Sequence, residues 1–544
     1  MPKKSIPLFV FALTLGFYVY TLLPSLAWGD GGKLQSEAIS GESFLLAEMP
    51  PDQFTPDPFI FSRVGVAAWD HPLYIVLGHL LVQALPFVDS LWLVNFISAL
   101  FGAASVALVF QLCYRFTGSF FASLYGGLSL AVAHTFWWHS STPEVYTLFV
   151  FLFLLSFAFF DQFERTGRTS ALVYSTLFLG LAASTHVLAF LAIPALGLYY
   201  LFSGSYQNFH LSSFRKLIMP SFGFLAGFSL YIVQFIRMSE NFPLNRIMGP
   251  VVGSTFLNQV GTLSPILLGE SLLTYLFFLT VQFGPVGLIL GGFGIRRLFS
   301  LKDLFLRKII YAFIVFALFG IFYRVTDQFT FFISSYVFWA MLMGIGSDYA
   351  FKLLPEKRRF LLPVALGLLL VATPFFYGIL PKLAESNGMN DASIGIPKIG
   401  TGVRDGLAYY MSPNQRGDYN AYRFGEQTIA GLAPDAVVIA EWYIDTDEYF
   451  ILRYFAEIKK VRTDVTVVGW PTQEPFAFDS QLALNAIKKS LPERPIYLAS
   501  LSDRFYAASK LVESYCIVPE DNLYRLYRKG DKARQCLGGG AVTE

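Results

Sequence analysis

Long runs of apolar residues without a charge dominate this sequence as far as residue 380. A chain segment can lie in lipid only if its backbone polar groups are bonded internally, and a helix achieves this within one segment. About 20 apolar residues are enough for a helix to cross the hydrocarbon layer. The runs therefore predict a polytopic α-helical membrane protein. The composition agrees, because only 14% of the residues are charged, against about 25% in soluble proteins.

The apolar runs suggest about eleven spanning helices. They lie near residues 5–24, 92–113, 119–137, 145–161, 170–187, 188–203, 217–236, 271–294, 308–324, 329–349 and 360–380. The first run follows Lys3 and Lys4 and resembles a signal peptide. It is longer than a signal core, which favours an uncleaved helix over the alternative of cleavage near Ala27.

Basic residues are concentrated in alternate loops, which predicts the orientation of the chain. These residues are Arg115, Arg165, Arg168, Arg215, Lys216, Arg296, Arg297, Lys302, Arg307, Lys308, Lys357, Arg358 and Arg359. The positive-inside rule makes their loops cytoplasmic. The apolar run 71–87 would reverse this pattern if it crossed the membrane, so we expect a re-entrant or interfacial helix there, bounded by Pro72 and Pro86. The loop 25–91, the hairpin 134–144, the turn 323–327 and the tail are then outside.

The tail changes character and predicts a small extracytoplasmic α/β domain over 385–544, after a membrane domain over 1–384. Strands are expected at 436–440, 465–468 and 495–499 and a helix at 446–460. Residues 386–401 are rich in Gly, Asn, Ser and Pro, which is typical of a linker. Cys516 and Cys536 could pair if this tail is outside the cytoplasm.

Several classes of function are disfavoured by the sequence. The net charge of +2 gives no reason to expect a nucleic-acid partner. The cysteines lack metal-ligand spacing, and no phosphate-binding loop, zinc-protease, serine-hydrolase or dinucleotide motif occurs. Asp445 and Asp447 form a DxD pattern that holds a metal in soluble glycosyltransferases. Here they precede the predicted tail helix, which favours helix capping.

Polar residues at the predicted outer face are the candidates for chemistry, because charges there usually serve a function. Asp30 lies among glycines in residues 28–32 and could act as a general base, or could be a solvated turn residue. His71 could bind phosphate or orient a base. The alternative for its segment is helix capping, with Asp70 as the cap and Pro72 in the first turn.

Further candidates lie in three later segments of the outer face. In residues 134–146, Trp137 and Trp138 suit a membrane-interface belt. Glu144 faces the same side as Asp30 and could serve the chemistry, or it could only complement the dipole of the helix that it begins. His186, near the outer end of the fifth span, could be a packing residue. Arg324 could bind a phosphate, or it could form an ion pair with Asp327.

In this order, the clusters resemble the GT-C class of membrane glycosyltransferases, and more narrowly bacterial relatives of the transmembrane protein O-mannosyltransferases. The stretches that carry the resemblance are WGDGG at 28–32, HPLYIVLGHLL at 71–81, NFISALFGAASVALV at 95–109, HTFWWHSSTPEVYTL at 134–148, LGLAASTHVLAFLAIP at 179–194 and DQFTFFISSY at 327–336. A weaker similarity to the same class lies at 436–455 and 462–465. No single motif is specific, but their order is.

The resemblance implies transfer of a sugar from a polyprenyl-phosphate carrier to a protein or glycan acceptor at the outer side of the bacterial inner membrane. Mannose is one candidate sugar. Asp30 matches the catalytic base of the class and Glu144 the acidic residue of the second outer loop. His71 matches a position that contacts donor or acceptor. The substrate-binding candidates are Arg324, Asp327, His186, Tyr146 and Asn95.

The sequence departs from the class at two positions. Asn95 stands where many members carry an arginine, so that Arg324 or Arg246 would have to supply the cation, and Gly31 replaces the second acid of the Asp-Glu pair. Some members need a divalent metal, and metal use is open. The alternatives are a transporter or flippase-like protein, disfavoured by few mid-span charges and no clear inverted repeat, and a scaffold, in which Asp30 and Glu144 would have no role.

Overall fold

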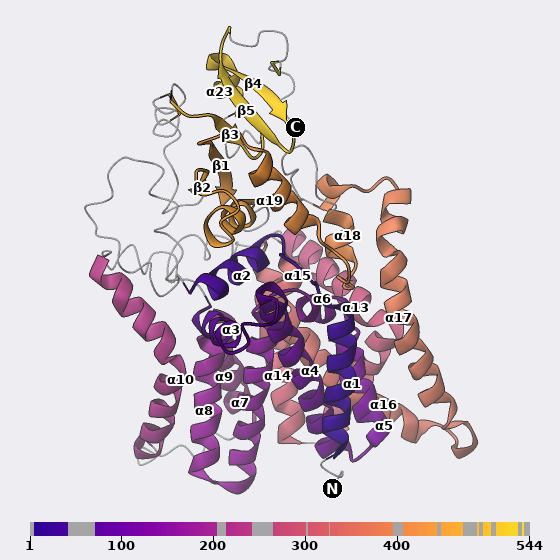
Figure 1. Cartoon of the computed structure of the whole chain (residues 1–544). Coiled ribbons are helices and arrows are strands. Elements are labelled where there is room, and N and C mark those ends of the chain that lie inside the picture. Colours follow the sequence, from indigo (N-terminus) through magenta and orange to yellow (C-terminus); the bar gives the residue numbers. More distant parts are fainter. Residues whose placement is uncertain are drawn as a thin grey trace.

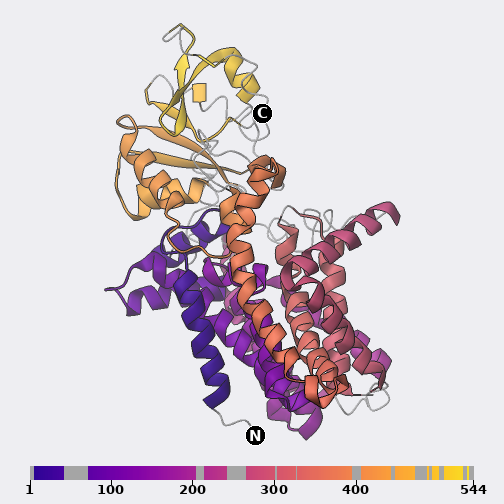
Figure 2. The same cartoon turned by 90° about the vertical axis from the view of Figure 1, so that its right-hand side faces the viewer.

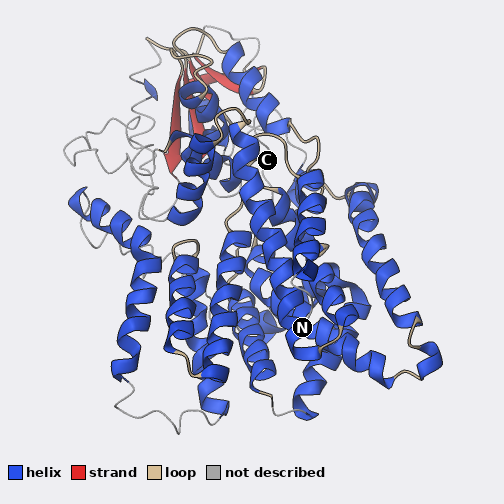
Figure 3. Ribbon diagram, turned by 60° about the horizontal axis from the view of Figure 1, so that its bottom comes forward, coloured by secondary structure: helices blue, strands red, loops and turns tan. Residues whose placement is uncertain are grey.

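The computed structural model describes residues 5–41, 71–203, 214–241, 265–300, 303–325, 327–394, 406–442, 448–471, 487–488, 493–501, 508–530 and 536–537. In these residues, a bundle of helices is followed by a five-stranded sheet that lies beyond one end of the bundle (Figures 1 and 3). The predictions about Asp70, Arg246, Asp445 and Asp447 fall outside the described residues.

Each predicted span falls on a helix of the bundle. The helices are α1 (Ser5–Thr21), α4 (Ser90–Thr117), α5 (Phe120–Ala131), α7 (Tyr146–Thr166), α8 (Thr169–Ala183), η5 (Val187–Leu191) with α9 (Ala192–Ser203), α10 (Phe214–Asn241), α13 (Pro265–Ser300), α14 (Leu304–Phe322), α16 (Ile333–Leu353) and α17 (Leu361–Ser386). Among the described helices, 6 are long and apolar enough to cross a membrane. The chain is therefore an integral membrane protein, and the total of about eleven spans stays a prediction.

The bundle has the distribution of side chains that lipid requires. Its interior is one large apolar core that includes Tyr18, Phe149 and Tyr336, each with no exposed surface. On the outside, α17 exposes large apolar side chains such as Val371 and Phe375. Lipid tails can cover such apolar surfaces favourably, whereas their exposure to water would be unfavourable.

Four shorter helices lie at one end of the bundle, which we call the upper end. They are α2 (Asp30–Ser40), α3 (Pro72–Ala84), α6 (His134–Ser141) and α15 (Gln328–Phe331). Figures 1 and 2 show α3 lying across this end, and the Leu73 N–H donates to the Ser184 carbonyl at the end of α8. The predicted helix at 71–87 is confirmed, while its failure to cross the membrane stays a prediction.

Two helices at the upper end differ from the sequence analysis. One of the two interpretations of residues 28–32 was a turn with a solvated Asp30, but Asp30 opens the helix α2, with Gly29 as its N-cap. The span expected over 119–137 ends at Ala131, and His134 begins the separate helix α6. Residues 132–138 are mostly apolar, with His134 and Thr135 as the exceptions, so hydropathy alone does not reveal this break.

The part of the chain after the bundle holds the sheet, with strand order β2-β1-β3-β5-β4. Its elements are η9 (Asp391–Ile394), α18 (Gly406–Met411), α19 (Asn420–Gly431), β1 (Val437–Trp442), α20 (Glu448–Arg453), the π-helical turn η10 (Tyr454–Ile458), β2 (Thr466–Pro471), β3 (Ile496–Leu498), α23 (Ala508–Ser514), β4 (Tyr515–Glu520) and β5 (Leu523–Arg528). β1 pairs with β2 and β3 in parallel, and β5 runs antiparallel to β3 and β4. The expected strands and helix are present, whereas β4, β5, α18 and α19 were not predicted. Cys516 and Cys536 form a disulfide.

This part of the chain packs against the upper end of the bundle. A shared apolar core joins Trp28 and Trp138 of the bundle end to residues of α19 and α20, and the rings of Trp28 and Phe424 lie 5.5 Å apart. Backbone bonds reinforce the contact, since the Gln415 N–H donates to the Thr21 carbonyl at 3.0 Å. The tail therefore covers the end of the bundle that carries the candidate residues.

Candidate active site

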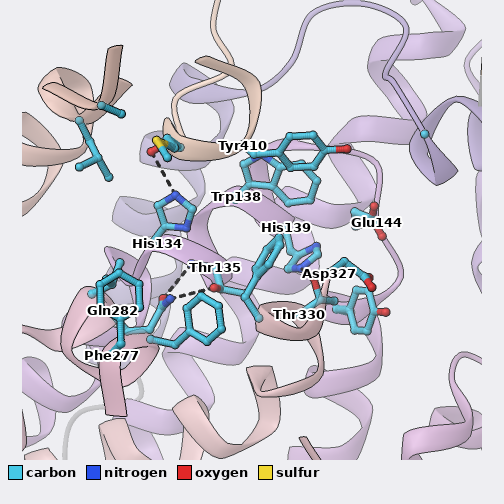
Figure 4. Close-up of a pocket in the computed structure, with 18 of the residues that line it drawn as sticks. His134, Thr135, Trp138, His139, Glu144, Phe277, Gln282, Asp327, Thr330 and Tyr410 are labelled. Atoms are coloured by element: carbon cyan, nitrogen blue, oxygen red, sulfur yellow. Dashed lines mark hydrogen bonds between the residues drawn. The ribbon is translucent and has the colours of Figure 1, made fainter. Parts of the chain in front are cut away.

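A cavity of about 780 Å³ lies at the upper end of the bundle, beneath the tail. Three carboxylates from separate segments line it, namely those of Asp30, Glu144 and Asp327. Tyr146 also lines it, so that four of the residues predicted from the sequence share one cavity. Figure 4 shows Glu144, Asp327, His139 and Thr330 toward one end and His134, Gln282 and Phe277 toward the other.

Glycines allow the segment around Asp30 to fold closely enough to bring it into the cavity. Gly29 has φ 64°, a left-handed conformation that favours glycine. A Cβ at Gly31 would lie 2.8 Å from the Ala27 Cβ and 3.0 Å from the Pro143 Cγ. Pro143 directly precedes Glu144, so this close approach joins the segments of the two carboxylates.

Asn95 holds the segment that precedes Asp30. It is fully buried and donates to the carbonyls of Leu23 at 2.8 Å and Ser25 at 3.1 Å. Its own amide oxygen accepts from Gln35 at 2.7 Å, and Gln35 in turn accepts from the Ala27 N–H. Asn95 does not line the cavity, and its contacts are those of a positioning residue.

Glu144 lies between the buried helix α6 and the start of α7. Its backbone N–H donates to the Ser98 hydroxyl at 3.0 Å, and that hydroxyl donates to the Glu144 carbonyl at 2.9 Å. Burial raises the pKa of the Glu144 carboxyl well above its usual value, and the nearby charges of Asp30 and Asp327 raise it further. Asp30 and Asp327 are thus close enough to Glu144 that their negative charges disfavour its ionisation.

His139 lies beside this group of acids and was not predicted as a site residue. It is 1% exposed, and its Nε2 lies 3.2 Å from the Thr330 hydroxyl. Its Nδ1 has no hydrogen-bond partner among the described residues. Burial lowers the pKa of His139 to about 3, so the ring is neutral at physiological pH. A buried polar atom without a partner is costly, and a bound substrate could satisfy Nδ1.

His71 and His186 lie behind the cavity rather than on its surface. The His71 Nδ1 lies 2.6 Å from the Thr185 carbonyl, which can only accept, so this nitrogen carries the proton. Its ring stacks on His186 with centroids 5.3 Å apart, and His186 lies 5.0 Å from the ring of Tyr146. Both histidines therefore back Tyr146, which itself lines the cavity.

Arg324 lies outside the set of residues that line the cavity. Its side chain is 43% exposed and forms a long ion pair with Glu270 at 3.9 Å, whereas the sequence suggested Asp327 as its partner. Exposed ion pairs of this kind are weak. The guanidinium can therefore exchange Glu270 for another anion at little cost.

The interpretation of Trp137 and Trp138 as an interface belt is wrong. Both are buried, and their indole N–H groups bond within the protein: that of Trp137 donates to the Thr21 hydroxyl and that of Trp138 to the Tyr409 carbonyl. The ring of Trp138 also stacks on Tyr410 of α18, with centroids 5.6 Å apart. Contacts with α1 and the tail, which the sequence does not reveal, bury these rings inside the protein.

The far end of the cavity combines polar groups with an apolar wall. The Gln282 amide accepts from the Thr135 backbone N–H and donates to its hydroxyl, both at 2.8 Å, as Figure 4 shows. Gln282 precedes a kink of α13 at Gly284, whose φ is 64°. The wall comes from α13, α15 and α17 and comprises Phe277, Phe278, Val281, Phe329, Phe376, Leu380 and Leu383. A polar residue within the apolar sequence of α13 was the signal that could have identified Gln282.

Metal binding has no structural support in the described part of the chain. No group of three or more His, Cys, Asp or Glu side chains there is placed to hold a metal ion.

Comparisons with known proteins agree with this architecture. Residues 70–210 match the family model described as "Protein O-mannosyl-transferase TMEM260 N-terminal domain". No curated protein sequence matches the chain. The crystal structure of ArnT from Cupriavidus metallidurans bound to undecaprenyl phosphate is similar over 96% of this chain and 97% of its own, with 12% identity and a TM-score of 0.57.

A second similar structure is the apo oligosaccharyltransferase of Archaeoglobus fulgidus. It matches over 97% of this chain and 75% of its own, with 12% identity and a TM-score of 0.53. At such identities the likeness concerns the fold. The chain therefore has the fold of the GT-C superfamily of membrane glycosyltransferases, and its residues 70–210 carry the match to the TMEM260 O-mannosyltransferase N-terminal domain.

Proposed function

We propose that this protein is a glycosyltransferase that moves a sugar from a polyprenyl-phosphate carrier to an acceptor at the extracytoplasmic side of the bacterial inner membrane. The observation that carries the proposal is the cavity in which three carboxylates meet an apolar wall. The wall suits the first part of a lipid chain and the carboxylates suit acid–base chemistry on a hydroxyl acceptor. The GT-C fold and the matched family support the same class of reaction.

We assign the general base to Asp30. Its carboxylate takes the proton of the acceptor hydroxyl while the acceptor oxygen bonds to the anomeric carbon of the sugar. The bond from that carbon to the carrier phosphate breaks on the opposite face, which inverts the configuration and releases polyprenyl phosphate. Glu144, with its raised pKa, holds a proton next to Asp30 and so limits the negative charge near the donor.

The other predicted residues have supporting roles in this proposal. Tyr146, Asp327 and His139 contact the sugar or the acceptor, and His71 with His186 fixes the position of Tyr146. The departing phosphate gains charge as the sugar bond breaks, so a nearby guanidinium stabilises the transition state more than the ground state. Arg324, whose ion pair with Glu270 is weak, is our candidate for this cation.

The disulfide between Cys516 and Cys536 supports an extracytoplasmic tail, because disulfides persist in oxidising compartments. Mannose as the sugar and a protein as the acceptor are part of the proposal through the matched family alone. The tail, which contributes Tyr410 and Met411 to the cavity, would assist binding of the acceptor.

The proposal is tested by incubating membranes that contain the full chain with a labelled polyprenyl-phosphate sugar and an extract of envelope acceptors. We expect labelled, non-lipid product and free polyprenyl phosphate in equal amounts. Membranes without the protein serve as the control. Translocation of the labelled lipid without product would contradict a transferase and favour a transporter.

A further inference from the structure

A second hollow lies at the lower end of the bundle, opposite the cavity, and has no role in the proposed reaction. Its volume is about 350 Å³. It is lined where the ends of α4, α7, α13 and α16 meet the start of α14. The residues are Arg115, Phe116, Thr117, Asp161, Arg165, Arg297, Asp303, Phe305, Ile345, Asp348 and Lys352. Segments far apart in the sequence thus bring four cations to one place.

The carboxylates of the hollow are engaged within the protein. Asp161 is 4% exposed and accepts from Arg115, Arg165 and Lys308 together. Asp348 pairs with Lys352 at 2.6 Å. Asp303 caps α14 by accepting from the N–H groups of Phe305 and Leu306. None of these acids needs a further cation.

Two cations of the hollow, Arg115 and Arg165, keep donors that these acids do not use. Arg115 and Arg165 each bond Asp161 through a single nitrogen, although a guanidinium has five N–H donors. Among the described residues no other acceptor bonds either side chain. Their side chains are 35% and 52% exposed, so these donors are accessible from outside. Arg297 adds a guanidinium that lies over the Tyr349 ring.

The position of the hollow indicates the kind of anion that reaches it. It lies at helix ends next to apolar surfaces exposed to lipid, and the positive-inside rule assigns this end to the cytoplasm. Basic pockets between spanning helices at that face bind the head groups of anionic lipids. Phe116, Phe305 and Ile345 add apolar side chains to the lining of the hollow.

We propose that this hollow is a binding site for the phosphate group of an anionic phospholipid. Arg165 binds the phosphate oxygens, Arg297 adds positive charge to the hollow, Arg115 is held in place by Asp161, and the acyl chains follow the outer surface of the bundle. The ligand chemistry, a phosphate ester, is shared with free phosphate, so the test must separate the two sources.

The experiment measures retention of phosphatidylglycerol by the purified full chain in detergent, using native mass spectrometry. Phosphatidylcholine and glycerol 3-phosphate are the comparison ligands. Arg165→Gln is the test variant, because Asp161 keeps Arg115 and Lys308. Arg358→Gln is the matched control, since it removes the same charge from an exposed position at the same end and outside the hollow.

We expect the parent and Arg358→Gln to retain phosphatidylglycerol in preference to phosphatidylcholine. Arg165→Gln should bind it about fivefold more weakly, the effect of one cation near an anionic lipid surface. Unchanged binding in Arg165→Gln, or equal losses in both variants, would overturn the site. Tight binding of glycerol 3-phosphate that competes with the lipid would overturn the lipid as the ligand. Melting temperatures of both variants control for folding.

Discussion

Glu144 carries a carboxyl group whose pKa is raised by burial and by the charges of Asp30 and Asp327. In the unfolded chain a glutamate has a pKa of about 4.3, so the folded protein binds more protons above that pH. The stabilisation associated with this group is complete below about pH 4.3 and is lost as pH rises toward the raised pKa. The contribution of Glu144 to stability is therefore smaller at neutral pH than at acidic pH.

Glu144→Gln removes this titration while keeping the shape of the side chain. We expect the melting temperature of the variant, relative to the parent, to rise steadily as pH increases from about 5 to about 8. The measurement is thermal unfolding in detergent at constant salt. A difference that stays constant with pH would contradict the raised pKa of Glu144.

His139 offers the second test of a single residue, through its Nδ1 atom. A Gln side chain can place its amide nitrogen near the position of Nε2 and keep the contact with Thr330, whereas Asn reaches only as far as Nδ1. If Nδ1 bonds the substrate, His139→Gln loses this hydrogen bond and should lower kcat/KM by about tenfold, which is the usual cost of one lost hydrogen bond. His139→Asn can keep the bond and should lower kcat/KM by less.

Because the pKa of His139 is lowered to about 3, neither variant should change the shape of the pH–rate profile between about pH 5 and 8. Equal activity of parent and His139→Gln would remove this residue from the site.

The sequence identified Asp30, Glu144, Tyr146 and Asp327 as candidates because charged and polar groups at an outer membrane face stand out. It did not identify His139, because its significance lies in burial without a partner, which requires the fold.

At the scale of elements, the start of α2 determines where Asp30 points. A Cβ at Gly32 would lie 2.7 Å from the carbonyl oxygen of Ala27, and backbone cannot yield as a flexible side chain can. Gly32→Ala should therefore shift α2, lower stability by about 1–3 kcal/mol and reduce sugar transfer.

The matched control is Gly16→Ala in α1, where no atom lies within 4 Å of the added Cβ. It should leave the melting temperature and transfer rate close to those of the parent. Full activity of Gly32→Ala with an unchanged melting temperature would show that the close contact at Ala27 is not needed. The two variants are compared in the same membrane assay and by thermal unfolding.

The long elements were predictable because lipid imposes a simple rule on sequence: apolar, uncharged and long enough. Helices α4, α7 and α14 lie close to their predicted ranges for this reason. The short helices α2 and α6 were not predicted, since their lengths are fixed by contacts with other segments. The positions of α18 and Tyr410 in the cavity also depend on tertiary contacts that no local pattern records.

At the scale of the whole molecule, the basic residues Arg115, Arg165 and Lys308 meet at one end and the cavity lies at the other. This is the arrangement that the positive-inside rule predicts for a chain whose helix α3 does not cross the membrane. Single cysteines at positions 66 and 90 should therefore react with an impermeant reagent from the same, outer side.

A cysteine at Gly167, between α7 and α8, should react only after the inner face is opened. The remaining free cysteine, Cys113, is buried and can be replaced first. Reaction of positions 66 and 90 from opposite sides would contradict the assignment of α3 and would reverse every basic loop that follows.

The central claim is that Asp30 activates the acceptor in a cavity that also holds the lipid donor. Its most direct test compares transfer rate and donor binding in the parent and in Asp30→Asn. Asp89→Asn, an exposed helix cap outside the cavity, is the matched control, because Asn also caps helices. We predict that Asp30→Asn binds the polyprenyl-phosphate sugar normally but transfers it about 10²–10⁴ times more slowly, while Asp89→Asn stays active. Near-parental transfer by Asp30→Asn at normal expression would contradict the claim and make Glu144 the first alternative base.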